Sequence, residues 1–104
     1  AGKGYQDVLM VTLGTGVGGG CVLNGKIVSG IHGAGGEIGH MPVKDDEPIA
    51  CNCGNHGCLE QYVSATGIVT QAKKVLDQDA RSSSLRNYEC LEAMSMMKLK
   101  MVML

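Results

Sequence analysis

Three cysteines within eight residues constrain the fold of this chain more than any other feature of its sequence. Cys51, Cys53 and Cys58 are separated by short, glycine-containing segments that relieve crowding of the backbone. Three thiolates at this spacing suit a tetrahedral zinc site that needs one further ligand. His56 lies within the same segment, and His40 lies eleven residues before Cys51. A site completed by His40 would tie two distant loops together, and the choice between the two histidines is open on spacing alone.

The alternative to a metal site is a set of reduced cysteines or a local disulfide. The chain has five cysteines, and an odd number with three of them clustered argues against the disulfide framework of a small secreted domain. No secretory signal is recognisable, so we favour metal binding and expect a reducing, cytoplasmic location. No apolar run approaches the roughly 18 residues of a membrane span. The net charge of -1 gives no electrostatic reason to expect nucleic acid or an anionic membrane as a partner.

A glycine-rich segment follows a short apolar run at residues 8–13, and this run predicts a buried strand. We expect residues 14–20 to form a tight loop. Glycines allow several backbone N–H groups to face one anion, and a threonine hydroxyl adds a donor. The alternative is a plain glycine-rich turn. The segment is not a Walker A loop, because no Lys-Ser or Lys-Thr follows, and a hairpin follows where a dinucleotide-binding fingerprint requires a helix.

The rest of the pattern predicts strands first and a helix later. Asn24-Gly25, between two short apolar segments, predicts a type I′ hairpin, because both turn positions need positive φ. Residues 40–43 predict one more short strand, and residues 59–76 predict a helix with a break at Gly67. A length of 104 residues allows one small domain, and the order of elements fits part of an α/β or α+β domain.

Two carboxylates lie next to the predicted zinc ligands. Glu37 precedes His40 by three residues, and Glu60 follows Cys58 by two. If His40 and Cys58 share one metal ion, the two carboxylates come close together and could accept hydrogen bonds from the hydroxyls of a sugar. The alternative for each of them is a solvated surface charge.

These motifs, taken together and in this order, resemble those of the ROK family (repressors, open reading frames and sugar kinases), and most closely its bacterial glucokinases. Gly-Glu-Ile-Gly-His stands at residues 36–40, and Cys-x-Cys-Gly-x-x-Gly-Cys-x-Glu stands at residues 51–60. The glycine-rich segment at 13–20 and Ser-Ala-Thr-Gly at 64–67 match as well. The resemblance covers residues 1–92 and implies an α/β fold, namely part of an actin-like, ribonuclease H-like ATPase lobe.

The resemblance implies a two-lobed kinase that transfers the γ-phosphoryl group of Mg-ATP to the 6-hydroxyl of glucose. The residues that match its second phosphate loop, near ATP, are Gly14, Thr15 and Gly16. The residues that match its ligands for sugar hydroxyls are Glu37, His40 and Glu60. The residues that match its structural zinc site are His40, Cys51, Cys53 and Cys58. The resemblance therefore implies that His56 is not a zinc ligand.

Two motifs of such kinases are missing from the sequence: the Asp-x-Gly-Gly-Thr phosphate loop and the Asn-Asp-Ala-Asn segment with the general-base Asp. We therefore expect a fragment of a longer enzyme, with no catalytic residue and no activity of its own, because phosphoryl transfer depends on positioning and electrostatics. Within the family, the alternatives are a kinase of another hexose or of an N-acyl-hexosamine, and a sugar-sensing repressor. An alternative of another class is a free-standing zinc module that binds proteins.

The composition changes abruptly at the end of the chain, since five of its seven methionines lie in residues 94–104. One interpretation is an amphipathic helix with Met94, Met97, Met101 and Leu104 on one face. We favour a frameshift near residues 90–93, because another reading frame can encode an acidic, alanine-containing helix that resembles the family at this point. Residues 1–92 would then be the partial kinase domain and residues 93–104 a non-native tail. We also expect a homo-oligomer, because exposed apolar patches favour association.

Overall fold

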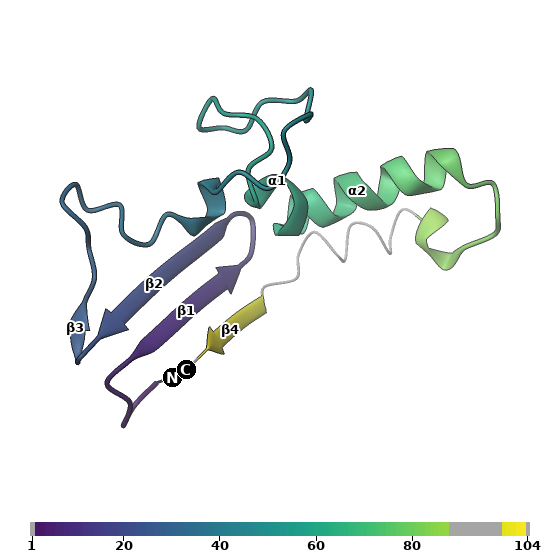
Figure 1. The fold of residues 1–104 in the computed structure, drawn as a ribbon. Helices are drawn as coiled ribbons and strands as arrows, with labels where there is room; N and C mark the ends of the chain where they lie inside the picture. Colours follow the sequence, from purple (N-terminus) through teal and green to yellow (C-terminus); the bar gives the residue numbers. More distant parts are fainter. Residues whose placement is uncertain (1, 88–98, 104) are drawn as a thin grey trace.

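The computed structural model describes residues 2–87 and 99–103. Its strands form one sheet in the order β3-β2-β1-β4, and every neighbouring pair is antiparallel (Figure 1). The strands are β1 (Val8–Leu13), β2 (Val17–Leu23), β3 (Lys26–Ile27) and β4 (Leu99–Met103). The helices, α1 (Glu60–Val63) and α2 (Ala65–Gln78), lie beyond the end of the sheet where β1 turns into β2.

The turn between β2 and β3 is the hairpin that the sequence predicts. Asn24 and Gly25 have φ values of 51° and 74°, the left-handed conformation that a type I′ turn needs at both positions. The backbone N–H of Asn24 donates to Asp7 Oδ1 at 2.7 Å, and the N–H of Gly25 donates to the carbonyl oxygen of Gln6 at 2.7 Å. These two bonds tie the turn to the segment that leads into β1.

The predicted glycine loop is shorter than expected. β2 begins at Val17, so only residues 14–16 form the turn, and the glycines at 18–20 are part of the strand. A Cβ on Gly19 would lie 2.8 Å from Ile38 Cγ1, and one on Gly36 would overlap the carbonyl oxygen of Gly19. The strand glycines therefore allow the segment before His40 to lie directly against the backbone of β2, a contact that local sequence does not reveal.

Residues 40–43 do not form the expected strand. The 3₁₀ helix η1 (Ile38–His40) comes first, and Pro42 then forms only an isolated bridge with Cys58. The N–H of Leu59 donates to the carbonyl oxygen of Met41 at 2.9 Å. The N–H of Val43 also donates to the carbonyl oxygen of Gly57 at 2.8 Å, so these bonds hold the backbone after His40 against the backbone at Cys58.

The predicted helix is present, but its break lies at Ser64 and not at Gly67. Ser64 has an extended backbone (φ -68°, ψ 162°), and its side chain accepts a hydrogen bond from the N–H of Gly67 at 3.0 Å, so it caps α2. Gly67 lies inside α2, where an added Cβ would be 2.6 Å from the carbonyl oxygen of Gln61. Glycine at this position does not end a helix. It allows α1 and α2 to touch. A further 3₁₀ helix, η2 (Ser84–Arg86), follows α2.

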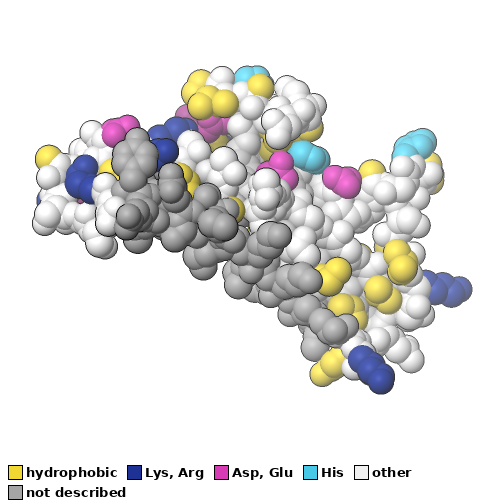
Figure 2. All heavy atoms as spheres, turned by 180° about the vertical axis from the view of Figure 1, so that it is seen from behind, with side chains coloured by type: hydrophobic (Ala, Val, Ile, Leu, Met, Phe, Trp, Pro, Cys, Tyr) yellow, Lys and Arg dark blue, Asp and Glu magenta, His cyan; other side chains and the backbone are white. Residues whose placement is uncertain are grey.

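Few apolar residues in the described part of the chain are buried: Val17, Cys51, Cys58 and Ala65. They lie where the β1–β2 turn, the cysteine segment and the start of α2 meet. Many other apolar side chains are exposed, and Figure 2 shows several of them at the surface over the strands and over the loop before α1. The radius of gyration is 16.4 Å, against about 13 Å for a compact domain of this length. The buried apolar residues that the structure describes therefore sit beside the candidate site.

β4 belongs to the methionine-rich tail and pairs with β1, with Leu9 opposite Met103 and Leu13 opposite Leu99. Residues 99–103 are thus a strand, and the amphipathic-helix interpretation is wrong for them. Met94 and Met97, and the proposed frameshift at 90–93, lie outside the described residues, so the frameshift stays a prediction. Neither helix that the structure describes has the length and apolar character needed to cross a membrane.

Candidate functional site

The cysteine loop (residues 51–58) folds tightly on itself. The N–H of Cys51 donates to the carbonyl oxygen of Asn55 at 2.7 Å, and the N–H of Gly54 donates to the carbonyl oxygen of Cys51 at 2.9 Å. Gly57 has a φ of 77°, and a Cβ there would overlap the carbonyl oxygen of Lys44. Because these bonds turn the backbone inward, the loop can direct its thiols toward one point.

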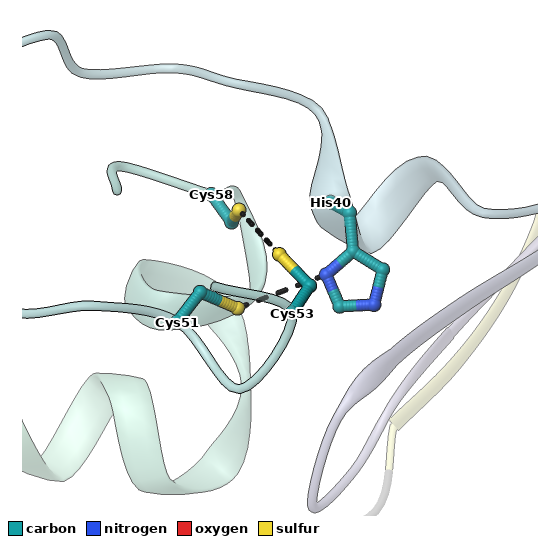
Figure 3. A group of neighbouring side chains, drawn as sticks. All are labelled: His40, Cys51, Cys53 and Cys58. Carbon is teal, nitrogen blue, oxygen red and sulfur yellow. Dashed lines mark hydrogen bonds between the residues drawn. The ribbon is translucent and has the colours of Figure 1, made fainter. Parts of the chain in front are cut away.

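Four side chains converge at this point: His40, Cys51, Cys53 and Cys58, whose ligand atoms all lie within 4.8 Å of one another (Figure 3). His40 Nδ1 is 3.7 Å from the sulfur of Cys51, and the sulfurs of Cys53 and Cys58 are 3.6 Å apart. In a zinc tetrahedron with Zn–S bonds of about 2.3 Å, two sulfurs are roughly 3.8 Å apart. The donor set and its spacing therefore fit Zn²⁺.

The structure distinguishes the two histidines that spacing alone left open. His56 does not belong to the cluster, and its Nδ1 forms a hydrogen bond with the carbonyl oxygen of Glu47 at 2.9 Å. None of the three cysteines of the loop is in a disulfide. The geometry thus agrees with the ligand set that the family resemblance implies, in which His40 is the fourth ligand.

The pKa values of two thiols in this cluster are shifted in opposite directions. Cys58 is fully buried, and burial is the main cause that raises the pKa of its thiol to about 12. The pKa of the Cys53 thiol is lowered, mainly by a backbone hydrogen bond at Asn55. A thiol that coordinates a metal ion is deprotonated, so a bound cation would supply the charge that a buried thiolate at Cys58 otherwise lacks.

Glu37 lies on the far side of the His40 ring from the cysteines. Its Oε2 is 3.8 Å from His40 Nε2, and its side chain is 66% exposed. The two ring nitrogens therefore face different partners, Nδ1 the sulfurs and Nε2 the carboxylate. A carboxylate at the second nitrogen commonly orients a metal-binding histidine, and the exposed oxygens of Glu37 stay available to a ligand.

Glu60, the first residue of α1, joins the cysteine segment to the glycine turn. Its Oε2 accepts a hydrogen bond from the N–H of Val17 at 2.8 Å. The N–H of Ala65 donates to the carbonyl oxygen of Gly14 at 2.7 Å. A Cβ on Gly16 would lie 2.6 Å from Glu60 Oε2, so this glycine leaves room for the carboxylate. The turn at 14–16 is thus held by the ends of both helices.

A pocket of about 260 Å³ opens beside these contacts. Its wall includes Thr15 from the glycine turn, Glu60 from α1 and Lys74 from α2. The pocket therefore brings together one residue predicted near ATP phosphates and one predicted to bind sugar. Glu37 and His40 are not among the residues that line it.

The sequence pattern does not single out Glu47, which follows Asp45 and Asp46. It is 5% exposed, and its carboxylate accepts a hydrogen bond from the hydroxyl of Tyr62. That bond lowers the pKa of Glu47, and burial together with the same bond raises the pKa of Tyr62 to about 12. The two acidic residues that precede it, Asp45 and Asp46, are exposed, and the sequence gives no sign that the next carboxylate turns inward.

The comparison with known proteins agrees with these motifs. The sequence profile described as "ROK family" matches residues 1–100. The chain belongs to the ROK family. Two curated relatives are a glucokinase of Halalkalibacterium halodurans, 46% identical over 89 residues, and an N-acetyl-D-glucosamine kinase of Yersinia enterocolitica, 38% identical over 99 residues. Each alignment covers 86% of this chain, but only 27% and 33% of the respective relative.

Solved ROK structures share the fold. A ROK glucokinase from Streptomyces griseus, solved in complex with glucose and AMPPNP, superposes with a TM-score of 0.65 at 40% identity, over 77% of this chain and 25% of the other. A ROK transcriptional regulator, homologous to the E. coli MLC protein, superposes with a TM-score of 0.67 at 30% identity, over 82% of this chain and 21% of the other. The chain thus has the architecture of ROK sugar kinases and regulators, and it spans about a quarter of their length.

Proposed function

We propose that the complete protein is an ATP-dependent glucokinase that transfers the γ-phosphoryl group of Mg-ATP to the 6-hydroxyl of glucose. The observation that carries the proposal is the pocket shared by Thr15 and Glu60, with the hydrogen bond from Val17 to Glu60 beside it. A kinase must hold a sugar hydroxyl and a phosphate next to each other, and this junction joins a carboxylate to a glycine turn. The H. halodurans and S. griseus glucokinases support the choice of glucose.

The sugar would be bound by Glu37, His40 and Glu60. Ionised carboxylates accept hydrogen bonds only, which suits the donating hydroxyls of a hexose. Glu37 has exposed oxygens, and Nε2 of His40 faces the same side. Glu60 uses Oε2 for Val17, so its other oxygen would accept from the sugar.

The phosphates of ATP would lie at Gly14, Thr15 and Gly16. Thr15 is exposed in the turn between two antiparallel strands and lines the pocket, so its hydroxyl can donate a hydrogen bond to an anion. Developing charge on a transferred phosphoryl group is stabilised by donors held in fixed positions. The bonds from Ala65 to Gly14 and from Val17 to Glu60 supply that rigidity.

Zinc would have a structural role, held by His40, Cys51, Cys53 and Cys58. Four protein ligands leave no position for a reactive water, as in closed structural sites. The ion would fix the His40 segment to the cysteine loop, and so hold two sugar ligands, His40 and Glu60, in register. A reducing, cytoplasmic location is part of the proposal, because oxidised thiols would not bind the ion.

We further propose that the 104-residue chain alone does not phosphorylate glucose, because its sequence has neither an Asp-x-Gly-Gly-Thr nor an Asn-Asp segment. A coupled assay with glucose and with N-acetylglucosamine, run on the chain and on the complete protein, tests both statements. Turnover of glucose by the complete protein only is the expected result. Turnover of N-acetylglucosamine alone would favour the alternative that the Yersinia relative represents, and equal turnover by the short chain would refute the role of the missing residues.

The second candidate is a sugar-sensing regulator, which the ROK regulator structure favours. A regulator would bind sugar without phosphorylating it and would bind operator DNA through a module outside the matched region. Binding of the complete protein to promoter fragments, measured with and without glucose, separates it from a kinase.

A further inference from the structure

The segment before the cysteine loop contains a buried carboxylate that the proposed sugar and metal sites do not use. The side chain of Glu47 is 3% exposed. Its carboxylate accepts a hydrogen bond from the hydroxyl of Tyr62 and another from the N–H of Ile49 at 3.2 Å. Lys74 Nζ lies 3.8 Å from Glu47 Oε1. A buried charge is costly unless hydrogen bonds compensate it, and Glu47 has two hydrogen-bond donors and a nearby ammonium group.

These partners belong to different parts of the fold. Tyr62 is on α1 and Lys74 is on α2, whereas Ile49 leads into the cysteine loop. The backbone of Glu47 reaches the loop itself, because its carbonyl oxygen is hydrogen-bonded to Nδ1 of His56 at 2.9 Å. His56, which is not a metal ligand in this geometry, thus connects the loop to Glu47. One residue is joined to both helices and to the cysteine loop.

Gln61 reinforces the same connection from the helix side. Its Oε1 accepts hydrogen bonds from the N–H groups of Gly57 and Cys58 at 2.8 and 3.0 Å. Its Nε2 donates to the carbonyl oxygen of Ile49 at 2.8 Å. Gln61 and Tyr62 directly follow Glu60, so the turn of helix that presents the predicted sugar ligand also holds the loop.

We propose that Glu47 is a positioning residue that holds the cysteine loop on α1 and α2, and so keeps the zinc ligands and Glu60 in a fixed relation. The proposal rests on the proposed zinc site, but not on the sugar or on the kinase reaction. Its consequence is that the loop is partly organised before the metal binds. Loss of Glu47 should therefore weaken zinc binding, although Glu47 contacts no zinc ligand through its side chain.

The first experiment measures the zinc affinity of the 104-residue chain by competition with a chromophoric chelator. We expect Glu47→Ala to bind zinc about tenfold more weakly, the lower end of the range for residues that support metal ligands. Glu47→Gln keeps an oxygen that can accept from Tyr62 and should stay within about threefold of the unmodified chain. The matched control is Asp46→Asn, an exposed neighbour that removes the same charge and should have no effect.

The second experiment follows amide hydrogen exchange in the zinc-free chain by NMR. In Glu47→Ala the amides of Gly57 and Cys58, which bond to Gln61, should exchange about tenfold faster. The amide of Val11 in β1 should keep its rate. Faster exchange at all these positions would mean general destabilisation and would overturn the proposal.

The outcomes are distinct. Unchanged zinc affinity in Glu47→Ala, or an equal loss in Asp46→Asn, overturns the proposal. If Glu47→Ala does not fold, as judged by far-ultraviolet circular dichroism, Tyr62→Phe decides, because it removes one hydroxyl and should also weaken zinc binding. If the unmodified chain binds no zinc, the metal site is wrong, and the exchange of Gly57 and Cys58 alone decides whether Glu47 holds the loop.

Discussion

Replacing Gly16 with alanine is the sharpest test of the junction between the glycine turn and Glu60. The added Cβ would lie 2.6 Å from Glu60 Oε2, whereas ordinary contact begins at 3.4 Å. The carboxylate would have to retreat by about 0.8 Å, which would lengthen its 2.8 Å bond from the N–H of Val17 to as much as about 3.6 Å, beyond hydrogen-bonding distance. A lost hydrogen bond to a charged group costs about 1.5–3 kcal/mol.

We therefore expect Gly16→Ala to lower the free energy of unfolding by about 1.5–3 kcal/mol, measured by urea titration with circular dichroism. The matched control is Gly20→Ala in β2, where the nearest atom to an added Cβ is Met10 Cε at 4.0 Å. This control should change stability by no more than about 0.5 kcal/mol. The two variants add the same methyl group, so a difference between them reports the contact with Glu60.

A double-mutant cycle identifies the cause. In a Glu60→Ala background the clash is absent, so adding Gly16→Ala should cost less than about 0.5 kcal/mol. If Gly16→Ala is as harmless as Gly20→Ala, or if its cost persists without the Glu60 carboxylate, the reasoning from the Glu60–Val17 contact is wrong.

Four further predictions follow from the site and the tail. The chain should bind one Zn²⁺, detected by elemental analysis. Cys58→Ala should release the ion and lower the sugar affinity of the complete protein without changing its ATP affinity. His56→Ala keeps all four metal ligands and should still bind the ion. Because the pKa of Tyr62 is raised from 10.0 to about 12, its contribution to the stability of the zinc-free chain should be complete below pH 10 and lost as the pH rises through 12. In urea titrations, Tyr62→Phe should not show this decrease in stability. Deleting residues 94–104 removes β4 and should leave zinc binding intact while changing oligomer size in gel filtration; loss of zinc would show that the tail is integral. Sequencing the gene should reveal the frameshift near residues 90–93, and a confirmed methionine-rich frame with a native stop would refute it.

Features with local causes were predictable from the sequence. Asn24-Gly25 needs only its own backbone preference to form the hairpin, and the spacing of Cys51, Cys53 and Cys58 alone restricts how their thiols can meet. The choice of His40 over His56 came from the family resemblance, and the geometry agrees with it. The roles of these residues toward zinc, sugar and ATP stay predictions.

Features with tertiary causes were not predictable. Gly67 has the local character of a helix break, but it is glycine because Gln61 of another helix lies against it. The glycines of β2 resemble a loop until the segment around Gly36 is placed on them. Glu47 resembles its exposed acidic neighbours, and only the positions of Tyr62 and Lys74 show why it is buried. In each case the partner belongs to another helix, strand or loop, so no pattern within one element contains the information.

Val17 shows how closely the predicted sites depend on one another. It is one of the few buried apolar residues in the described part of the chain, and its N–H donates to Glu60. Its carbonyl oxygen lies so close to Gly39, the neighbour of His40, that a Cβ on Gly39 would overlap it. One peptide segment thus touches the glycine turn, the carboxylate that follows the cysteine loop and the helix that carries His40. Because buried segments in such contact cannot shift independently, a zinc ion at His40 would hold the His40 segment in a fixed relation to Glu60, which gives a structural metal a reason to lie beside the predicted sugar ligands.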